Sequence, residues 1–67
     1  MAITLKAARV NKNLTQKEAA ELLGISESTL LNYEKGKTFP SQPTIEKMEG
    51  LYGVSYNDII FSPNNNG

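Results

Sequence analysis

A single glycine, Gly24, separates two short amphipathic segments, and this arrangement constrains the fold more than any other feature of the chain. Residues 16–23 precede it and residues 27–35 follow it, both with apolar side chains at helical spacing. Such spacing predicts two helices that bury one face each. Gly24 fits just past the first helix, because glycine adopts a left-handed backbone at little cost. The apolar positions are Ala19, Ala20, Leu23, Ile25, Leu30 and Tyr33.

The neighbouring residues supply signals that begin and end these two helices. Thr15 and Glu18 form a capping-box pattern, in which each side chain accepts a hydrogen bond from the other residue's backbone N–H. Ser26 is placed to cap the second helix, and Gly36 follows its last turn. Two short helices around a tight turn, the second with a polar outer face, have the layout of a helix-turn-helix. The second helix, Glu27–Lys35, is then expected to enter the major groove of DNA.

The rest of the chain favours three further helices. Residues 3–12 are expected to form the first, with Thr4 as its N-cap. A fourth helix is expected after Ser41, and it can contain Pro43 because proline is tolerated in the first turn of a helix. A short fifth helix is expected after Ser55. No segment alternates as a strand would, so the sequence predicts an all-α bundle. Expected inward residues are Leu5, Ala8, Ile45, Met48 and either Leu51 or Tyr52, and the fifth helix carries Ile59, Ile60 and Phe61.

The length and charge of the chain set limits on its partners. Its 67 residues allow one domain, expected over residues 1–61, with a polar flexible tail over residues 62–67. Seven basic and seven acidic side chains cancel, and the pI is near 6.2. Nucleic-acid-binding domains often have a pI above about 9. DNA binding therefore requires that positive charge gather on one face.

The composition also excludes whole classes of function. The chain has no histidine and no cysteine, which excludes disulfides, thiolate zinc sites and imidazole catalysis. So small a bundle has little room for a ligand cavity of about 300 Å³ or more. We therefore expect no enzymatic activity, cofactor, metal or small-molecule ligand. Neither a membrane span nor a secretory signal is expected, and the cytoplasm is the expected location.

A set of short motifs occurs in a fixed order along most of the chain. They are Leu5-x-x-x-Arg9, Leu14-Thr15-Gln16, Ala19-Ala20, Leu23-Gly24-Ile25-Ser26, Leu30-x-x-Tyr33-Glu34-x-Gly36-Lys37, Pro40 and Leu51-x-Gly53-Val54-Ser55. With them, the chain resembles the phage-repressor helix-turn-helix family (Cro/CI-like, also called XRE-like) over residues 5–60. Each motif alone is weak, but together they are specific. The resemblance implies a compact five-helix lambda-repressor-like bundle that binds double-stranded DNA, usually as a homodimer on a palindromic operator.

The resemblance also implies roles for individual residues. Arg9 and Glu34 look like the family's buried ion pair, which is structural rather than a DNA contact. The other expected roles are phosphate contacts for Gln16, Lys17, Lys35, Lys37 and Thr38, base reading for Glu27, Ser28, Thr29 and Asn32, and a dimer contact for Tyr56, Ile60 and Phe61. Asparagine suits base reading because its side chain can pair with N6 and N7 of adenine.

Several of these roles have open alternatives. The alternative for Gln16 and Asn32 is that they are solvated polar side chains without a DNA contact. Glu27 either accepts a hydrogen bond from cytosine N4 or acts as a first-turn partner of the helix dipole. Leu31 either touches a thymine methyl group or forms a partly buried edge. The residues of the expected dimer contact serve equally as a cap that closes the core.

The charges near the expected DNA face point to modest affinity. Lys17, Lys35 and Lys37 flank this face and Glu27 subtracts one charge, which leaves +2 per subunit (three minus one). Few phosphate contacts mean a shallow dependence of affinity on salt. The sequence thus favours a DNA-binding transcriptional regulator, a repressor on family grounds. The alternative is a protein-interaction module, an antitoxin or anti-regulator, that keeps the fold with weak or no DNA binding.

Overall fold

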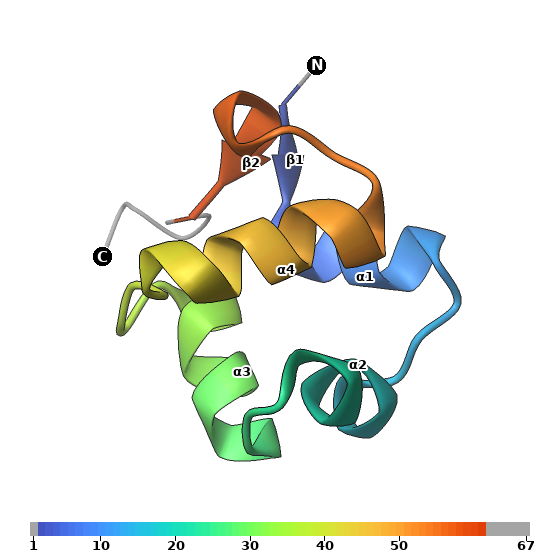
Figure 1. Ribbon diagram of the computed structural model, residues 1–67, viewed down its shortest axis with the longest axis vertical. Helices are drawn as coiled ribbons and strands as arrows, with labels where there is room; N and C mark the ends of the chain where they lie inside the picture. Colours follow the sequence, from blue (N-terminus) through green and yellow to red (C-terminus); the bar gives the residue numbers. More distant parts are fainter. Residues whose placement is uncertain (1, 62–67) are drawn as a thin grey trace.

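Four α-helices make up most of residues 2–61, the part of the chain described by the structure, a computed structural model. In chain order the elements are β1 (Ile3–Thr4), α1 (Leu5–Asn11), α2 (Gln16–Leu23), α3 (Glu27–Lys35), α4 (Gln42–Tyr52), the 3₁₀ helix η1 (Tyr56–Asp58) and β2 (Ile59–Ile60). The helices α2 and α3 lie at one end of the domain and the two strands at the other, with α1 and α4 between them (Figure 1). The predicted tail, residues 62–67, lies outside the described residues.

The first three helices begin at the capping residues that the sequence predicts. The Thr4 hydroxyl accepts from the backbone N–H of Ala7, with an N–O distance of 3.0 Å. The capping box of α2 is complete: Glu18 Oε1 accepts from Thr15 N at 2.9 Å, and Thr15 Oγ1 accepts from Glu18 N at 3.1 Å. Ser26 Oγ accepts a backbone N–H in the first turn of α3. The predicted boundaries of α2 and α3 are therefore confirmed.

The helix ends agree with the predictions at most positions. Gly24 and Gly36 follow α2 and α3 with φ angles of 75° and 78°, a left-handed conformation that favours glycine. Pro43 lies in the first turn of α4, as expected. Ser41 occupies the N-cap position but caps no backbone N–H. Its Oγ instead lies 3.1 Å from Oγ1 of Thr44. The predicted N-cap position is therefore correct, but the predicted capping by the Ser41 side chain is wrong.

Two predictions about secondary structure are wrong, and each has its own physical reason. The sequence predicted five helices and no strand, whereas residues 2–61 form four α-helices, one 3₁₀ turn and a two-stranded parallel sheet. Ile3 lies opposite Ile59, and Thr4 opposite Ile60. All four residues are β-branched, which favours extended backbone. The three residues of η1 are too few to form an α-helix, whose first turn is costly.

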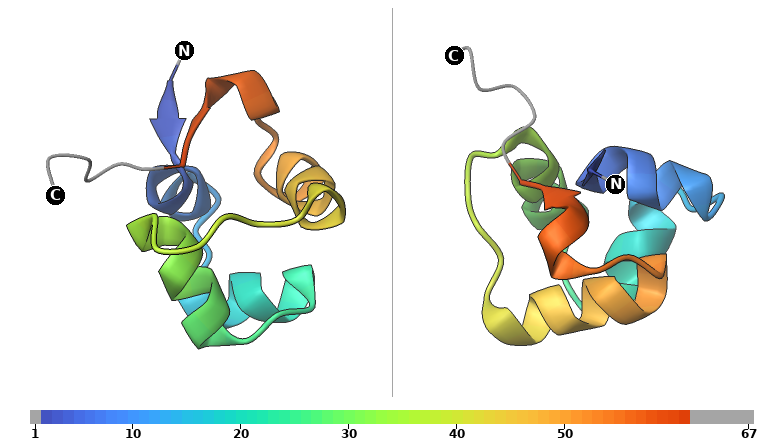
Figure 2. Two further views of the ribbon diagram at one scale, coloured as in Figure 1. Left: turned by 90° about the vertical axis from the view of Figure 1, so that its left-hand side faces the viewer. Right: turned by 90° about the horizontal axis from the view of Figure 1, so that it is seen from above.

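One hydrophobic core lies between the four helices. Leu30 of α3 and Met48 of α4 are completely buried, and Tyr52 rather than Leu51 is the fully buried residue at the end of α4. The other members of this core are Leu5, Ala8, Ala19, Ala20, Leu23 and Ile59. Residues 36–41 form an extended connection from α3 along the outside of the domain to α4 (Figure 2). This packing fixes α3 on α2 and leaves the outer side of α3 uncovered.

Candidate nucleic-acid interface

The outer side of α3 presents a polar stripe. Ser28, Asn32 and Lys35 are four and then three positions apart, so they lie along one face of the helix. Ser28 and Lys35 are exposed, and Asn32 is half-buried. Within residues 2–61 no hydrogen bond engages the Asn32 side chain, which leaves the donors and the acceptor of its amide available to a ligand. Leu31 is half-buried beside this stripe.

The hydroxyl groups at the start of α3 belong to the helix cap. Ser26 Oγ accepts from Thr29 N at 3.1 Å and donates to Thr29 Oγ1 at 2.8 Å. It also lies 3.3 Å from Ser28 Oγ. The Thr29 hydroxyl therefore accepts a hydrogen bond within the cap, and it donates none to another group of residues 2–61. Glu27 is exposed in the first turn, a position that fits both interpretations of its carboxylate.

Three exposed lysines lie on α2, on α3 and directly after α3. Lys17, Lys35, Lys37 and Thr38 are all exposed, and none of these lysines is in an ion pair within the described part of the chain. The backbone N–H of Lys37 donates to the Asn32 carbonyl at 2.9 Å, which closes the end of α3. Glu46 and Glu49 lie on α4 and Asp58 on η1. In Figure 1, η1 lies with the strands at the end opposite α2 and α3, and α4 lies between the two ends.

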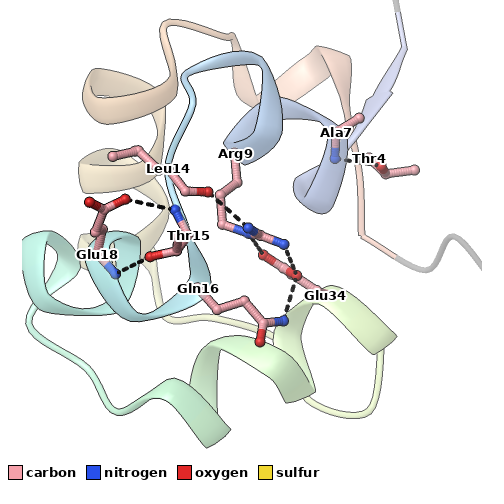
Figure 3. A network of polar contacts seen from close by, with 8 residues as sticks. All are labelled: Thr4, Ala7, Arg9, Leu14, Thr15, Gln16, Glu18 and Glu34. Atoms are coloured by element: carbon pink, nitrogen blue, oxygen red, sulfur yellow. Dashed lines mark hydrogen bonds and ion pairs between the residues drawn. The ribbon is translucent and has the colours of Figure 1, made fainter.

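The predicted ion pair between Arg9 and Glu34 is present. Arg9 Nε lies 2.7 Å from Glu34 Oε2, and the two side chains are 8% and 4% exposed. A second bond runs from Arg9 Nη2 to Glu34 Oε1 at 3.3 Å, and Arg9 Nη1 donates to the Leu14 carbonyl at 2.9 Å (Figure 3). The pair therefore joins α1 to the last turn of α3 and to the segment before α2.

Gln16 lies against this ion pair, a contact that the sequence analysis missed. Its Nε2 donates to Glu34 Oε1 at 3.2 Å, and the side chain is half-buried at the first position of α2 (Figure 3). The two residues are 18 positions apart, so no local periodicity reveals the contact. The residue predicted to contact a phosphate is thus held by a buried carboxylate.

The phenol of Tyr52 is buried with its hydroxyl unpaired. The residue is 2% exposed, and no hydrogen bond within residues 2–61 satisfies its oxygen. Burial raises the pKa of Tyr52 to about 12; the nearby Glu34 carboxylate adds to the rise and the Arg9 guanidinium opposes it. An unpaired buried hydroxyl costs about 1–3 kcal/mol, so this oxygen weakens the domain.

We expect Tyr52→Phe to stabilise the domain or leave it unchanged at pH 7, and to flatten the loss of stability at high pH. The pKa of Tyr52 is raised, so the folded state keeps a proton that the unfolded state releases above pH 10. The free energy of unfolding therefore does not depend on this group below about pH 10. As the pH rises from 10 towards 12, the free energy of unfolding falls by up to about 2–3 kcal/mol. Urea unfolding between pH 8 and about pH 11.5 measures it. Parallel pH curves for the two proteins would contradict the assignment.

Glu49 is a second residue whose role the sequence did not reveal. Its Oε2 accepts from the backbone N–H of Tyr56 at 2.7 Å. Ser55 Oγ accepts from Asn57 N at 3.3 Å, which matches the predicted cap at this serine. The carboxylate from α4 thus fixes the start of η1, and η1 leads directly into β2.

An aromatic patch, formed by Phe39, Tyr56 and Phe61, lies near the end of the described chain. The ring centroid of Phe61 is 4.7 Å from that of Phe39 and 5.5 Å from that of Tyr56. Phe39 and Tyr56 are exposed, as is Ile60, whereas Phe61 is half-buried and packs against the core. Phe61 therefore caps the core as one interpretation expected. Phe39 was not among the residues predicted for a dimer contact.

The described residues offer little for other kinds of chemistry. Residues 2–61 contain no pocket of ligand size and no group of three or more acidic side chains able to hold a metal ion. None of the helices in this range is long and apolar enough to cross a membrane. The polar stripe of α3, with the exposed Lys17 and Lys37, remains the surface best suited to a ligand.

Comparison with known proteins agrees with this arrangement of helices. The family model described as helix-turn-helix matches residues 5–59. The transcriptional repressor RstR of a cryptic CTXphi phage in Vibrio cholerae is 36% identical over 56 residues, which are 84% of this chain and 50% of the relative. The transcriptional regulator ImmR of Bacillus subtilis is 47% identical over 84% of this chain and 44% of the relative.

A further relative is closer in length. The uncharacterized helix-turn-helix regulator MJ0272 of Methanocaldococcus jannaschii is 42% identical over 84% of this chain and 85% of its own length. The chain spans about half the length of the first two relatives, RstR and ImmR. No solved structure gives a significant match. The chain belongs to the phage-repressor-like helix-turn-helix family.

Proposed function

We propose that the chain is a non-catalytic DNA-binding domain that regulates transcription in the cytoplasm, as a repressor, and reads the major groove with α3. The single observation that carries this proposal is the uncovered polar stripe on the second helix of a helix-turn-helix, with Ser28 and Lys35 exposed and Asn32 half-buried. The relatives support it, because RstR is named a transcriptional repressor, and ImmR and MJ0272 transcriptional regulators.

Each part of this surface has a distinct task in the proposal. Asn32 reads adenine through its unengaged amide, and Ser28 contacts a base or a phosphate. Thr29 contributes its hydroxyl proton, and Glu27 accepts from cytosine N4. The proposed phosphate contacts are Gln16, Lys17, Lys35, Lys37 and Thr38. Base contacts set the sequence and phosphate contacts set the register of the protein on the duplex.

We also propose that two copies bind a palindromic operator. The exposed side chains of Tyr56, Ile60 and Phe39, together with Phe61, supply the contact between the copies. Aromatic side chains are enriched in the cores of protein interfaces, and clustered exposed rings therefore suit this role. The net charge of +2 at each DNA face doubles to +4 in such a dimer, still few enough charges for a shallow salt dependence.

Selection of bound duplexes from a random DNA library at about 0.1 M salt tests the proposal. The expected result is an enriched palindrome with half-sites about 10–10.5 base pairs apart, or a multiple of that. Enrichment of a single half-site would contradict the dimer and retain DNA reading. No enrichment by the folded protein would favour a protein-interaction module instead. One relative, 38% identical over 84% of this chain, is the antitoxin PezA of Streptococcus pneumoniae.

Asn32→Ala is expected to weaken binding to the selected duplex by about 1–3 kcal/mol and to relax the preference at one base pair. Lys37→Ala is the matched control, because a lost phosphate contact weakens all sequences alike and lowers the salt slope by about one. Fluorescence anisotropy on the selected and a scrambled duplex at several salt concentrations separates the two effects. Equal losses on both duplexes for Asn32→Ala would remove it from the base-reading set.

A further inference from the structure

The amide of Gln16 is held in one orientation by Glu34. Glu34 Oε1 accepts from Gln16 Nε2 at 3.2 Å, and the same carboxylate is fixed by two bonds from Arg9, at 2.7 and 3.3 Å. A carboxylate accepts hydrogen bonds, so the NH₂ end of the amide faces Glu34. One of its two N–H groups is thereby used, and within residues 2–61 the other N–H and the oxygen make no hydrogen bond.

We infer that Glu34 is a positioning residue for the DNA contact of Gln16, through which the buried ion pair sets the affinity for phosphate. This inference rests on the proposed function, since it deepens the phosphate role of Gln16. A glutamine side chain that moves freely loses rotamer entropy when it binds, whereas one already held loses little. The free N–H then points to the phosphate at the start of α2, alongside the backbone N–H groups of that helix end.

The chain contains a matched internal control. It has two glutamines, Gln16 and Gln42, and each is the first residue of its helix. Gln42 is exposed, and its side chain makes no hydrogen bond within residues 2–61. The two amides therefore differ in the contact with Glu34 and share their position in a helix.

NMR relaxation of the side-chain NH₂ groups in the free protein tests whether Glu34 restricts the motion of the Gln16 amide. We expect the order parameter of Gln16 to approach the value of about 0.85 found for rigid backbone, and that of Gln42 to fall below about 0.6. Two equally mobile amides would overturn the inference without any reference to DNA.

A double-mutant cycle on DNA binding tests the consequence. The Arg9→Met/Glu34→Leu variant removes the ion pair at zero change in net charge, and such apolar replacements often leave a fold intact. Gln16→Ala is made in the parent and in this variant, and the affinities for the selected duplex are compared. We expect the loss caused by Gln16→Ala to be about 2–10-fold larger in the parent, equivalent to about 0.4–1.4 kcal/mol. The salt slope should not change when the ion pair is removed, because the pair carries no net charge.

The outcomes distinguish the inference from the function on which it rests. Equal losses from Gln16→Ala in both backgrounds overturn the positioning role and keep the phosphate contact. An unchanged affinity of Gln16→Ala in the parent overturns the phosphate contact itself, and the inference falls with it. If Arg9→Met/Glu34→Leu does not fold, Glu34→Asp takes its place, because it keeps the charge beside Arg9 and draws the carboxylate back from Gln16.

Discussion

Glu34→Ala is expected to lower the free energy of unfolding by about 3–5 kcal/mol, because it leaves a buried charge without its partner. The Arg9 side chain is 8% exposed, so bulk solvent compensates its charge poorly once the carboxylate is lost. Domains have a total stability of about 5–15 kcal/mol, and the smallest lie at the lower end. The variant should therefore be largely unfolded at moderate urea concentrations. Circular dichroism during urea titration measures the change in the midpoint.

The control for this prediction is Arg9→Met/Glu34→Leu, in which both charges are removed together. We expect it to recover most of the stability, since replacing a whole buried ion pair by packed apolar groups is often neutral or stabilising. A loss below about 1 kcal/mol for Glu34→Ala, the range of an exposed ion pair, would contradict the role assigned to burial.

Leu30→Ala is expected to destabilise the domain by about 2–5 kcal/mol, because it opens a cavity at the centre of the core. The residue is 0% exposed and lies on the inner side of α3, opposite the polar stripe. Since this side chain anchors the helix proposed to read DNA, affinity should fall together with stability. Urea unfolding measures the first effect, and anisotropy on the selected duplex the second.

Leu22→Ala makes the same chemical change on the surface of α2 and serves as the matched control. Leu22 is 62% exposed, so the change is expected to stay within about 0.5 kcal/mol. Similar losses for the two variants would show that the core does not lie where the structure has it.

The parts of the fold that the sequence predicts correctly are those with local causes. The capping box of Thr15 and Glu18 acts within one turn, and Gly24 and Gly36 end helices through their own backbone preference. The apolar spacing of α2 and α3 then assigns the inner faces, including Leu30. These causes operate within about four residues, which is the range in which periodicity carries information.

The errors concern contacts between distant residues. Ile59 and Ile60 were assigned to a helix, but their partner strand lies at the other end of the domain sequence and has only two residues. The bond from Glu49 to Tyr56 N was also missed, since nothing in the local pattern links α4 to η1. In the candidate interface, the ion pair of Arg9 and Glu34 was predicted from the family resemblance. The hydrogen bond from Gln16 to Glu34 was not predicted and is seen only in the structure.

The pairing of β1 with β2 has a consequence for the order in which the domain folds. Ile3 and Ile59 are 56 positions apart, so their contact closes a loop that contains all four helices. The entropy lost in closing a loop grows with its length, and two short strands return little for it. The helical core must therefore assemble first and bring the strands together. The ladder is then expected to form last and to open first, so its amide groups should exchange with solvent faster than those of the helical core.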